Sequence, residues 1–154
     1  MSVISQSTSI DCSPKEIFQF ITKPANIISV SPTMPSLHFH SPKLMLGKGQ
    51  IINFDLSYGL FKLSWTSKIS RFEPYTFFED SLVEGPFKKW IHRHRFEAHG
   101  RKTIIQDEIE YEVGLGPLGK IMDTLVIGYQ IENFFKKRQK KTTEKFQHIK
   151  RHIA

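Results

Sequence analysis

Polar and apolar residues alternate along residues 85–112, on both sides of the turn residue Gly100. The apolar face of this stretch consists of Trp90, His92, His94 and Phe96 before the glycine, and of Thr103, Ile105, Asp107, Ile109 and Tyr111 after it. A period of two residues around a glycine turn predicts a long β-hairpin with one covered and one solvated face. The covered face is unusual because two histidines and an aspartate lie among its aromatic and aliphatic residues.

The first 84 residues predict a strand, two short helices and then further strands. Residues 2–10 are β-prone and partly alternating. Ser13, Pro14 and Glu16 together are typical of a helix start, because serine caps the helix, proline suits its first position and glutamate completes a capping box. Residues 24–30 predict a second short helix. Further alternating runs predict strands at residues 37–40, 51–58, 63–69 and 75–83. Their short connections favour an antiparallel meander.

After Tyr111 the period of the apolar residues lengthens from two to three or four. Residues 114–117 form a Gly/Pro breaker cluster, and no proline follows it. The apolar residues beyond it recur at helical spacing, at Ile121, Met122, Leu125 and Tyr129, with Ile127, Ile131 and Phe134 widening the stripe. This spacing predicts a long C-terminal helix from about residue 118 whose continuous apolar stripe ends after Phe135.

Composition places the chain among globular proteins. Its 154 residues are 39% hydrophobic and 24% charged, which is ordinary for one soluble domain spanning residues 1–154. No segment approaches the ~20 apolar residues that cross a bilayer, and the start lacks a signal-peptide pattern. The single cysteine, Cys12, excludes an internal disulfide, so we expect a reducing, cytoplasmic location. Thirteen phenylalanines indicate either a large aromatic core or an apolar cavity.

The formal net charge of +7 comes from the end of the chain. Residues 136–154, here called the basic tail, contain eight Lys and Arg and one acidic residue, Glu144, whereas the remaining residues are balanced. Such a segment is typical of a solvated helix end, where cations also complement the helix dipole. Weak contact with an anionic membrane surface is the alternative. Nucleic acid is a disfavoured partner, because only Phe146 interrupts the charges and no recognition motif is present.

The order of these elements resembles the helix-grip fold of the START-related SRPBCC superfamily, and within it the small bacterial ligand-binding SRPBCC domains and polyketide cyclase-like proteins. The residues that match are the turn Gly85-Pro86-Phe87, the strand Trp90/His92/His94/Phe96, the strand Thr103/Asp107/Tyr111, the segment Gly116-Pro117-Leu118-Gly119 and Asp80. The resemblance implies an α+β fold with a strongly curved seven-stranded antiparallel sheet. It further implies two short helices after the first strand, a long C-terminal helix packed across the sheet, and a cavity between the two.

Asp80, His92, His94 and Asp107 are the candidate chemical groups. A carboxylate beside an imidazole can fix its tautomer and raise its basicity, and two histidines with a carboxylate can bind a metal. The simplest interpretation is a polar network that braces the sheet, because buried polar groups need partners. We rank bracing above hydrogen bonding to a ligand, and both above catalysis or metal binding. We therefore expect no cofactor and no metal.

The leading hypothesis is non-catalytic binding of a small hydrophobic or lipid-like molecule in the cavity. The candidate ligand-binding residues are Phe54, Tyr58, Trp65, Phe78, Trp90, His92, His94, Phe96, Asp107, Tyr111, Met122, Leu125 and Tyr129. An alternative is a polyketide cyclase- or aromatase-like enzyme that uses His92 or His94 with Asp80 or Asp107. A further alternative is a membrane- or nucleic-acid-surface adaptor acting through the basic tail. The pattern predicts no particular oligomeric state.

Overall fold

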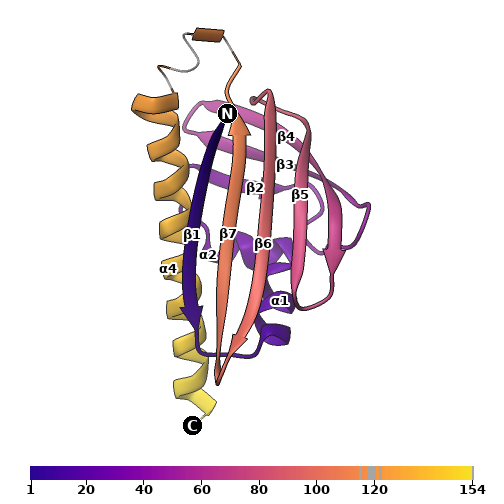
Figure 1. Ribbon diagram of the computed structural model, residues 1–154, viewed down its shortest axis with the longest axis vertical. Coiled ribbons are helices and arrows are strands. Elements are labelled where there is room, and N and C mark those ends of the chain that lie inside the picture. The colour runs from indigo at the N-terminus through magenta and orange to yellow at the C-terminus, as the bar shows by residue number, and fades with distance from the viewer. Residues whose placement is uncertain (115, 118–120, 122, 154) are drawn as a thin grey trace.

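The computed structural model describes residues 1–114, 116–117, 121 and 123–153. Their helices and strands follow the predicted order (Figure 1). The elements are β1 (Ser2–Ile10), α1 (Pro14–Ile21), α2 (Pro24–Val30), β2 (Ser36–Phe39), β3 (Ile51–Tyr58), β4 (Phe61–Glu73), β5 (Phe77–Glu84), β6 (Lys89–His99), β7 (Lys102–Glu112), the π-helical turn η1 (Asp123–Ile127) and α4 (Gly128–Ile153).

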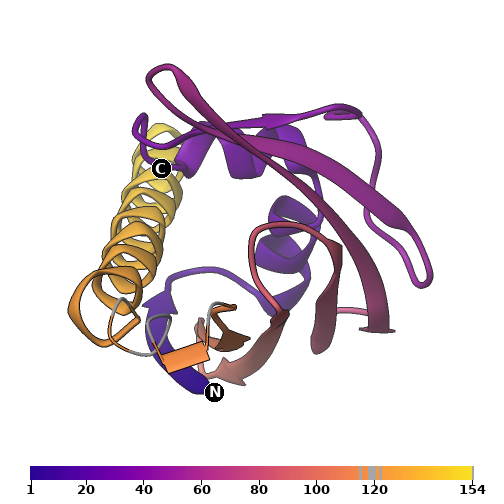
Figure 2. The ribbon, with the colours of Figure 1, turned by 90° about the horizontal axis from the view of Figure 1, so that it is seen from above.

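The strands form one antiparallel seven-stranded sheet in the order β1-β7-β6-β5-β4-β3-β2. The sheet curls strongly, so that β3 and β4 face back toward α4 across the interior (Figure 2). Helix α4 packs against β1 at one edge of the sheet and against α2. This arrangement confirms the α+β class and the long helix across a curved sheet.

The chain enters this fold through a well-capped helix. The backbone N–H of Ser13 donates to Glu16 Oε2 at 2.8 Å, and the backbone N–H of Glu16 donates to Ser13 Oγ at 3.3 Å. This is the predicted capping box, and Pro14 lies at the first helical turn. Ile17 and Phe18 of α1 are buried against the sheet. Helix α1 therefore covers one end of the curved sheet.

The long hairpin of β6 and β7 has the predicted register. Asp107 lies opposite His94, and Tyr111 lies opposite Trp90. Along both strands buried residues alternate with more exposed ones, as the period of two predicts. On the next strand, Asp80 of β5 lies opposite His92. The register therefore brings both carboxylates beside the two histidines on one face.

Two irregularities between β4 and β5 curve the sheet at the site. The pairing shifts between Thr66 and Ser67 and again between Ile69 and Arg71. Such bulges bend a strand and increase its twist. The 13 residues of β4 consequently wrap around the interior and place Trp65 and Ser67 next to β5.

The residues of the C-terminal helix that face inward differ from those that the spacing predicts. Tyr129, which regular helical spacing assigns to the inner stripe, is 68% exposed, and Ile121 is also exposed. The turn η1 precedes α4, and a π-turn takes more residues than an α-turn, so it rotates the following residues relative to a continuous 3.6-residue pattern. The inner face of α4 then consists of Ile131 and Phe135 followed by polar residues.

The buried residues form two apolar clusters. One lies beneath α1 and contains Cys12, Ile17, Phe18, Ile69, Phe78, Phe96 and Ile105 with Ile10. The other lies beneath α4 and contains Trp65, Trp90, Ile109, Tyr111 and Phe135. No helix among the described residues is long and apolar enough to cross a membrane.

Candidate functional site

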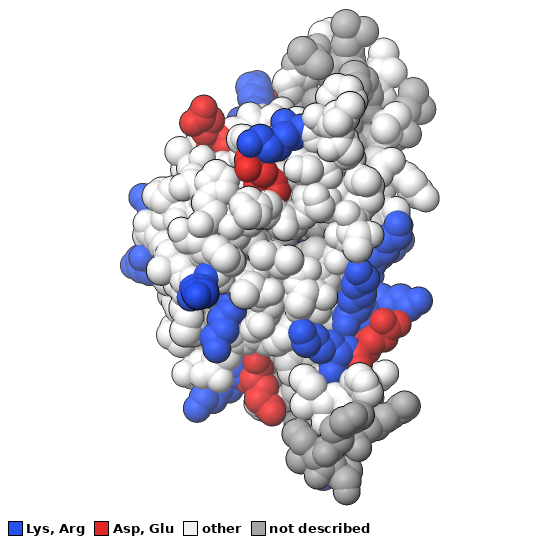
Figure 3. Space-filling model, turned by 180° about the vertical axis from the view of Figure 1, so that it is seen from behind, with Lys and Arg blue, Asp and Glu red and all other residues white. Residues whose placement is uncertain are grey.

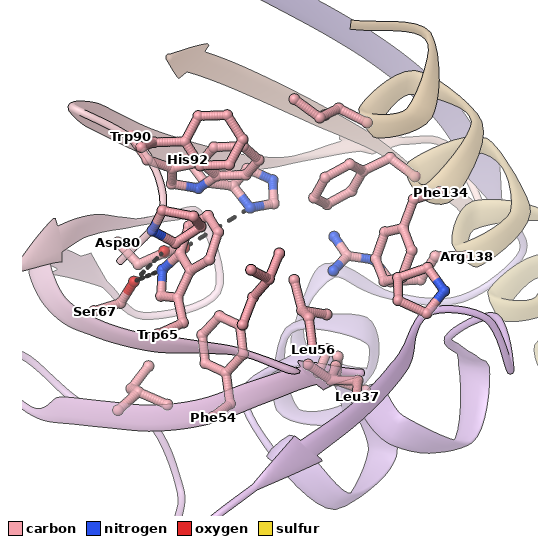
Figure 4. Close-up of a pocket in the computed structure, with 18 of the residues that line it drawn as sticks. Leu37, Phe54, Leu56, Trp65, Ser67, Asp80, Trp90, His92, Phe134 and Arg138 are labelled. Atoms are coloured by element: carbon pink, nitrogen blue, oxygen red, sulfur yellow. Dashed lines mark hydrogen bonds and ion pairs between the residues drawn. The ribbon is translucent and has the colours of Figure 1, made fainter. Parts of the chain in front are cut away.

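A cavity of about 520 Å³ lies between the concave face of the sheet and α4. Strands β2 to β6, both short helices and α4 contribute to its wall (Figure 4). The wall is mostly apolar, and its polar members include Ser67, Asp80, His92, His94 and Arg138. A concave, mainly apolar space with a few polar groups is the usual form of a small-molecule site.

Aromatic side chains shape one side of this cavity. Trp65 stacks on Phe54 with ring centroids 5.5 Å apart and meets Trp90 edge-on at 5.0 Å. Phe87, from the turn before β6, packs against both tryptophans. These contacts keep the indole rings in place, so this wall is preformed.

The polar cluster, defined as Asp80, His92, His94, Asp107 and Arg138, lies where β5, β6, β7 and α4 meet. His92 Nε2 is 3.1 Å and His94 Nδ1 is 2.8 Å from the same oxygen, Asp107 Oδ1. The His94 contact is an ion-pair contact whose direction is poor for a hydrogen bond. The opposite nitrogens, His92 Nδ1 and His94 Nε2, each lie 3.8 Å from Asp80 Oδ2. Each imidazole is therefore placed between the two carboxylates.

Neighbouring side chains fix the two carboxylates. Gln139 of α4 donates from Nε2 to Asp107 Oδ2 at 2.9 Å. Ser67 donates to Asp80 Oδ1 at 3.3 Å, and Trp65 Nε1 donates to Ser67 Oγ at 3.0 Å. The oxygens that do not face the histidines thus have partners of their own.

Arg138 extends from α4 into the cavity wall, opposite His92 (Figure 4). Its side chain is 14% exposed, Nη2 lies 4.0 Å from Asp107 Oδ1, and the guanidinium lies 4.3 Å from the ring centre of Phe135. Burial lowers the pKa of Arg138, and the attraction of Asp107 and Asp80 offsets part of that shift. The guanidinium is consequently a buried cation at the edge of an apolar cavity.

The polar cluster shifts the pKa values of its two histidines in opposite directions. Burial, together with repulsion from His94, lowers the pKa of His92 to about 4. Burial also opposes the charged form of His94, but contacts with Asp107 and Asp80 outweigh it and raise the pKa of His94. Burial disfavours ionised Asp80 and Asp107 as well, yet their histidine contacts hold both pKa values below the usual range. Of the two imidazoles, the cluster thus favours protonation of His94 and disfavours that of His92, while both carboxylates are favoured as anions.

The structure brings together seven of the predicted ligand-binding residues on the cavity wall: Phe54, Tyr58, Trp65, Phe78, Trp90, His92 and His94. Asp107 lies behind the histidines and borders a much smaller pocket next to Gln139. Phe96 packs in the cluster beneath α1 instead. The hydroxyl of Tyr111 donates to Asp123 Oδ1 at 2.5 Å, away from the cavity. Tyr129 faces solvent, Met122 lies outside the described residues, and so does the side chain of Leu125.

Sequence reasoning missed the polar residues of α4 and several apolar wall residues. Arg138 and Gln139 belong to a segment whose charge pattern is typical of a solvated end. Only their position in the helix indicated that they point inward, because both continue the inner face of α4 beyond Phe135. Ser67 shares the alternating face of Trp65 and Ile69, which indicates its inward direction. Further wall residues are Ile21, Ile27, Pro35, Leu37, Phe39, Ile52, Leu56, Leu63, Ile131 and Phe134.

The arrangement offers binding, proton transfer and cation coordination rather than covalent catalysis. Cys12 is buried beneath α1, in the other apolar cluster. The polar residues that line the cavity carry imidazoles, a carboxylate, hydroxyls, an amide and a guanidinium. One donor atom each from Asp80, His92 and His94 lies within 4.8 Å of the others.

The sequence matches one family model over residues 10–135, described as polyketide cyclase / dehydrase and lipid transport. No curated protein matches. Among solved structures, a protein from Thermus thermophilus has a TM-score of 0.71 at 14% identity, and the match covers 91% of this chain and 96% of that protein's chain. A START superfamily protein from Mycobacterium smegmatis has a TM-score of 0.68 at 15% identity, covering 93% and 97%. The major latex-like protein 151 from Panax ginseng has a TM-score of 0.57 at 16% identity, covering 86% and 95%.

Proposed function

The chain belongs to the polyketide cyclase / dehydrase and lipid transport family, and from this premise we propose that it binds a small hydrophobic or lipid-like molecule without transforming it. Its fold is the helix-grip fold of the START-related SRPBCC superfamily. The observation that carries the proposal is the cavity of about 520 Å³ with its mainly apolar wall. An apolar molecule gains free energy by leaving water for such a wall, at about 25 cal/mol per Å² of apolar surface buried.

The wall also suggests how the ligand lies. Most of its aliphatic and aromatic residues come from α1, α2, β2, β3, β4 and α4, whereas the polar cluster lies on β5, β6, β7 and one position of α4. A molecule with one polar group binds best with that group toward Arg138 and the histidines, because this satisfies buried hydrogen-bonding groups. Tyr58, Leu63 and Val126 both line the cavity and are exposed, so they lie where it meets solvent.

Native mass spectrometry of gently purified protein tests the binding. We expect a retained apolar molecule, or rapid uptake of an environment-sensitive hydrophobic dye. Leu56→Trp, on the cavity wall, should abolish dye uptake by filling the space. Leu60→Trp is the matched control, because Leu60 is fully exposed at the tip of the same hairpin. Equal uptake by the two variants, with both folded, contradicts the proposal.

A specific observation favours cyclase- or aromatase-like chemistry as the second candidate. His92 and His94 contact Asp107 on one side and open toward the cavity with Asp80 on the other. A base of this kind can remove a proton only from a substrate within hydrogen-bonding reach. Product analysis after incubation with a polyketide-like substrate decides between the two. Turnover that Asp80→Asn eliminates, while dye uptake persists, favours the enzyme.

We also propose that α4 makes weak contact with anionic membranes. Lysine and arginine side chains gather along α4 on the face shown in Figure 3. Lys136, Lys137 and Lys140 are exposed, whereas Lys141 donates to Ser31 O at 2.9 Å and Lys145 to Ser29 Oγ at 2.8 Å. Lys136 and Lys140 form exposed ion pairs with Glu132 and Glu144 of the same helix. Because such exposed pairs are weak, the three exposed lysines are the ones best placed to reach phosphate groups.

Liposome flotation tests this contact with substitutions rather than truncation, because removing residues 136–154 also removes Arg138 and Gln139 from the site. Replacing Lys136, Lys137 and Lys140 by Gln should reduce flotation with anionic vesicles and leave neutral vesicles unaffected. Unchanged flotation of the triple variant contradicts membrane contact through α4.

A further inference from the structure

Three donor atoms converge on the cavity side of the polar cluster. His92 Nδ1 and His94 Nε2 each lie 3.8 Å from Asp80 Oδ2, and one donor atom from each of the three residues lies within 4.8 Å of the other two. Around a tetrahedral Zn²⁺, bonds of about 2.0–2.2 Å put neighbouring donors roughly 3.4 Å apart. Small side-chain rotations therefore close the set around one ion.

We propose that Asp80, His92 and His94 form a site for one divalent transition-metal ion of the Zn²⁺ type, open toward the cavity. Two imidazoles and a carboxylate suit ions of the Zn²⁺ type, whereas Mg²⁺ and Ca²⁺ take oxygen ligands. Three protein ligands leave at least one coordination position unfilled, as in catalytic rather than structural zinc sites. That position faces a space large enough for a second molecule.

The groups behind the ligands support this assignment independently. In protein metal sites the nitrogen of a ligating histidine that faces away from the ion commonly donates to a carboxylate. Here the far nitrogens of both histidines contact Asp107 Oδ1, at 3.1 and 2.8 Å. Asp107 is itself held by Gln139, and the far oxygen of Asp80 accepts from Ser67. His92 and Asp80 thus have hydrogen-bond partners on their far sides, and His94 has an ion-pair contact with Asp107.

Electrostatics also favours a cation at this point. If both histidines are neutral with their N–H groups toward Asp107, two imidazole lone pairs and one carboxylate oxygen face one another at close range. A positive charge between them removes that repulsion, and a proton or a metal ion can supply it. Arg138 opposes the ion, but its Nη2 atom contacts Asp107, at 4.0 Å, on the side of the histidines away from the ligand atoms. The arginine leaves the metal-bound cluster positive, which favours an anionic or oxygen-bearing group in the open position.

A second histidine–aspartate pair provides the internal control. His40 Nε2 lies 3.1 Å from Asp55 Oδ2, but the His40 side chain is 52% exposed, and no grouping of three donors is found there among the described residues. This pair therefore has the chemistry of the proposed site without its convergence.

Isothermal titration with Zn²⁺ and the visible absorption of added Co²⁺ test the proposal on the full, tag-free chain after chelator treatment. We expect one ion per chain and Co²⁺ bands of a low-coordinate nitrogen and oxygen site. Asp80→Asn should weaken Zn²⁺ binding by about 100-fold or more, and Ser67→Ala by about 10-fold, since partners behind ligands typically contribute 10- to 100-fold. His40→Asn should bind like the wild type.

Circular dichroism with chelator present confirms that each variant is folded before titration. Absence of one-to-one Zn²⁺ binding by the wild-type chain overturns the proposal. Wild-type affinity in both Asp80→Asn and Ser67→Ala does so too. Because Ser67 contacts no proposed metal position, its variant keeps the test decisive if Asp80→Asn fails to fold. The titration requires no hydrophobic ligand, so its result is separate from the test of the proposed function.

Discussion

Arg138→Met should destabilise the fold far more than substitution of an exposed lysine in the basic tail. Methionine keeps the length and the apolar contact with Phe135 but removes the charge that faces Asp107. At the observed 4.0 Å, attraction between unit charges is about 4 kcal/mol for an effective dielectric constant of about 20. Removing one partner of a buried pair typically costs about 3–5 kcal/mol. His94 still compensates Asp107 and methionine restores packing, so we expect a loss of about 2–3 kcal/mol.

Urea unfolding followed by circular dichroism measures this loss. With a slope of roughly 2 kcal/mol per molar urea, the midpoint should fall by about 1 M. Lys140→Met is the matched control on the same helix, because Lys140 is 77% exposed and its ion pair with Glu144 spans 3.9 Å. Such exposed pairs contribute about 0.3–0.5 kcal/mol. Equal midpoints for the two variants would refute the inference that Arg138 is a buried partner of Asp107.

Three further predictions follow from individual contacts. Trp90→Ala should cost about 3–5 kcal/mol in chemical denaturation, because the side chain is only 8% exposed and packs in the cluster beneath α4; a loss below about 1 kcal/mol contradicts this packing. Thr103→Val should cost about 1–2 kcal/mol, since Thr103 Oγ1 donates to Cys12 O at 2.7 Å in a fully buried position; wild-type stability would show that the bond contributes nothing. Contacts with Lys89 and Arg93 lower the pKa of Glu110, so its contribution to stability is present above its unfolded pKa and disappears as the pH falls through its lower folded pKa. Glu110→Gln should therefore flatten the fall in thermal midpoint below about pH 4.5, and an unchanged acid profile contradicts the assignment.

The helix start at Ser13 and the hairpin at residues 85–112 follow from short-range rules that can be read from the sequence. Ser13, Pro14 and Glu16 form the capping box that their spacing predicts. The period of two in 85–112 becomes a hairpin whose register places Asp107 opposite His94. In each case the deciding interactions join residues close in sequence or directly paired across one turn, so the pattern contains the information.

The phase of α4 shows where short-range rules stop. Regular helical spacing assigns Tyr129 to the inner face, but the π-helical turn at Asp123–Ile127 shifts the faces, and Tyr129 is exposed. The same shift directs Arg138 and Gln139 inward, although their composition is that of a solvated helix end. Composition reports how many charges a segment contains, whereas packing against Asp107 decides which of them are buried.

The sequence by itself determined the order of elements and the inward direction of the two histidines, because periodicity and turn residues encode them locally, and its resemblance to a known superfamily implied the fold class. Only the tertiary structure decided that Asp80 and Arg138 join Asp107 beside those histidines, and that the space next to them is a cavity rather than a filled core. These features depend on how far the sheet curls and where α4 crosses it. Both are set by bulges in β4 and by contacts between segments more than a hundred residues apart, which no local pattern contains.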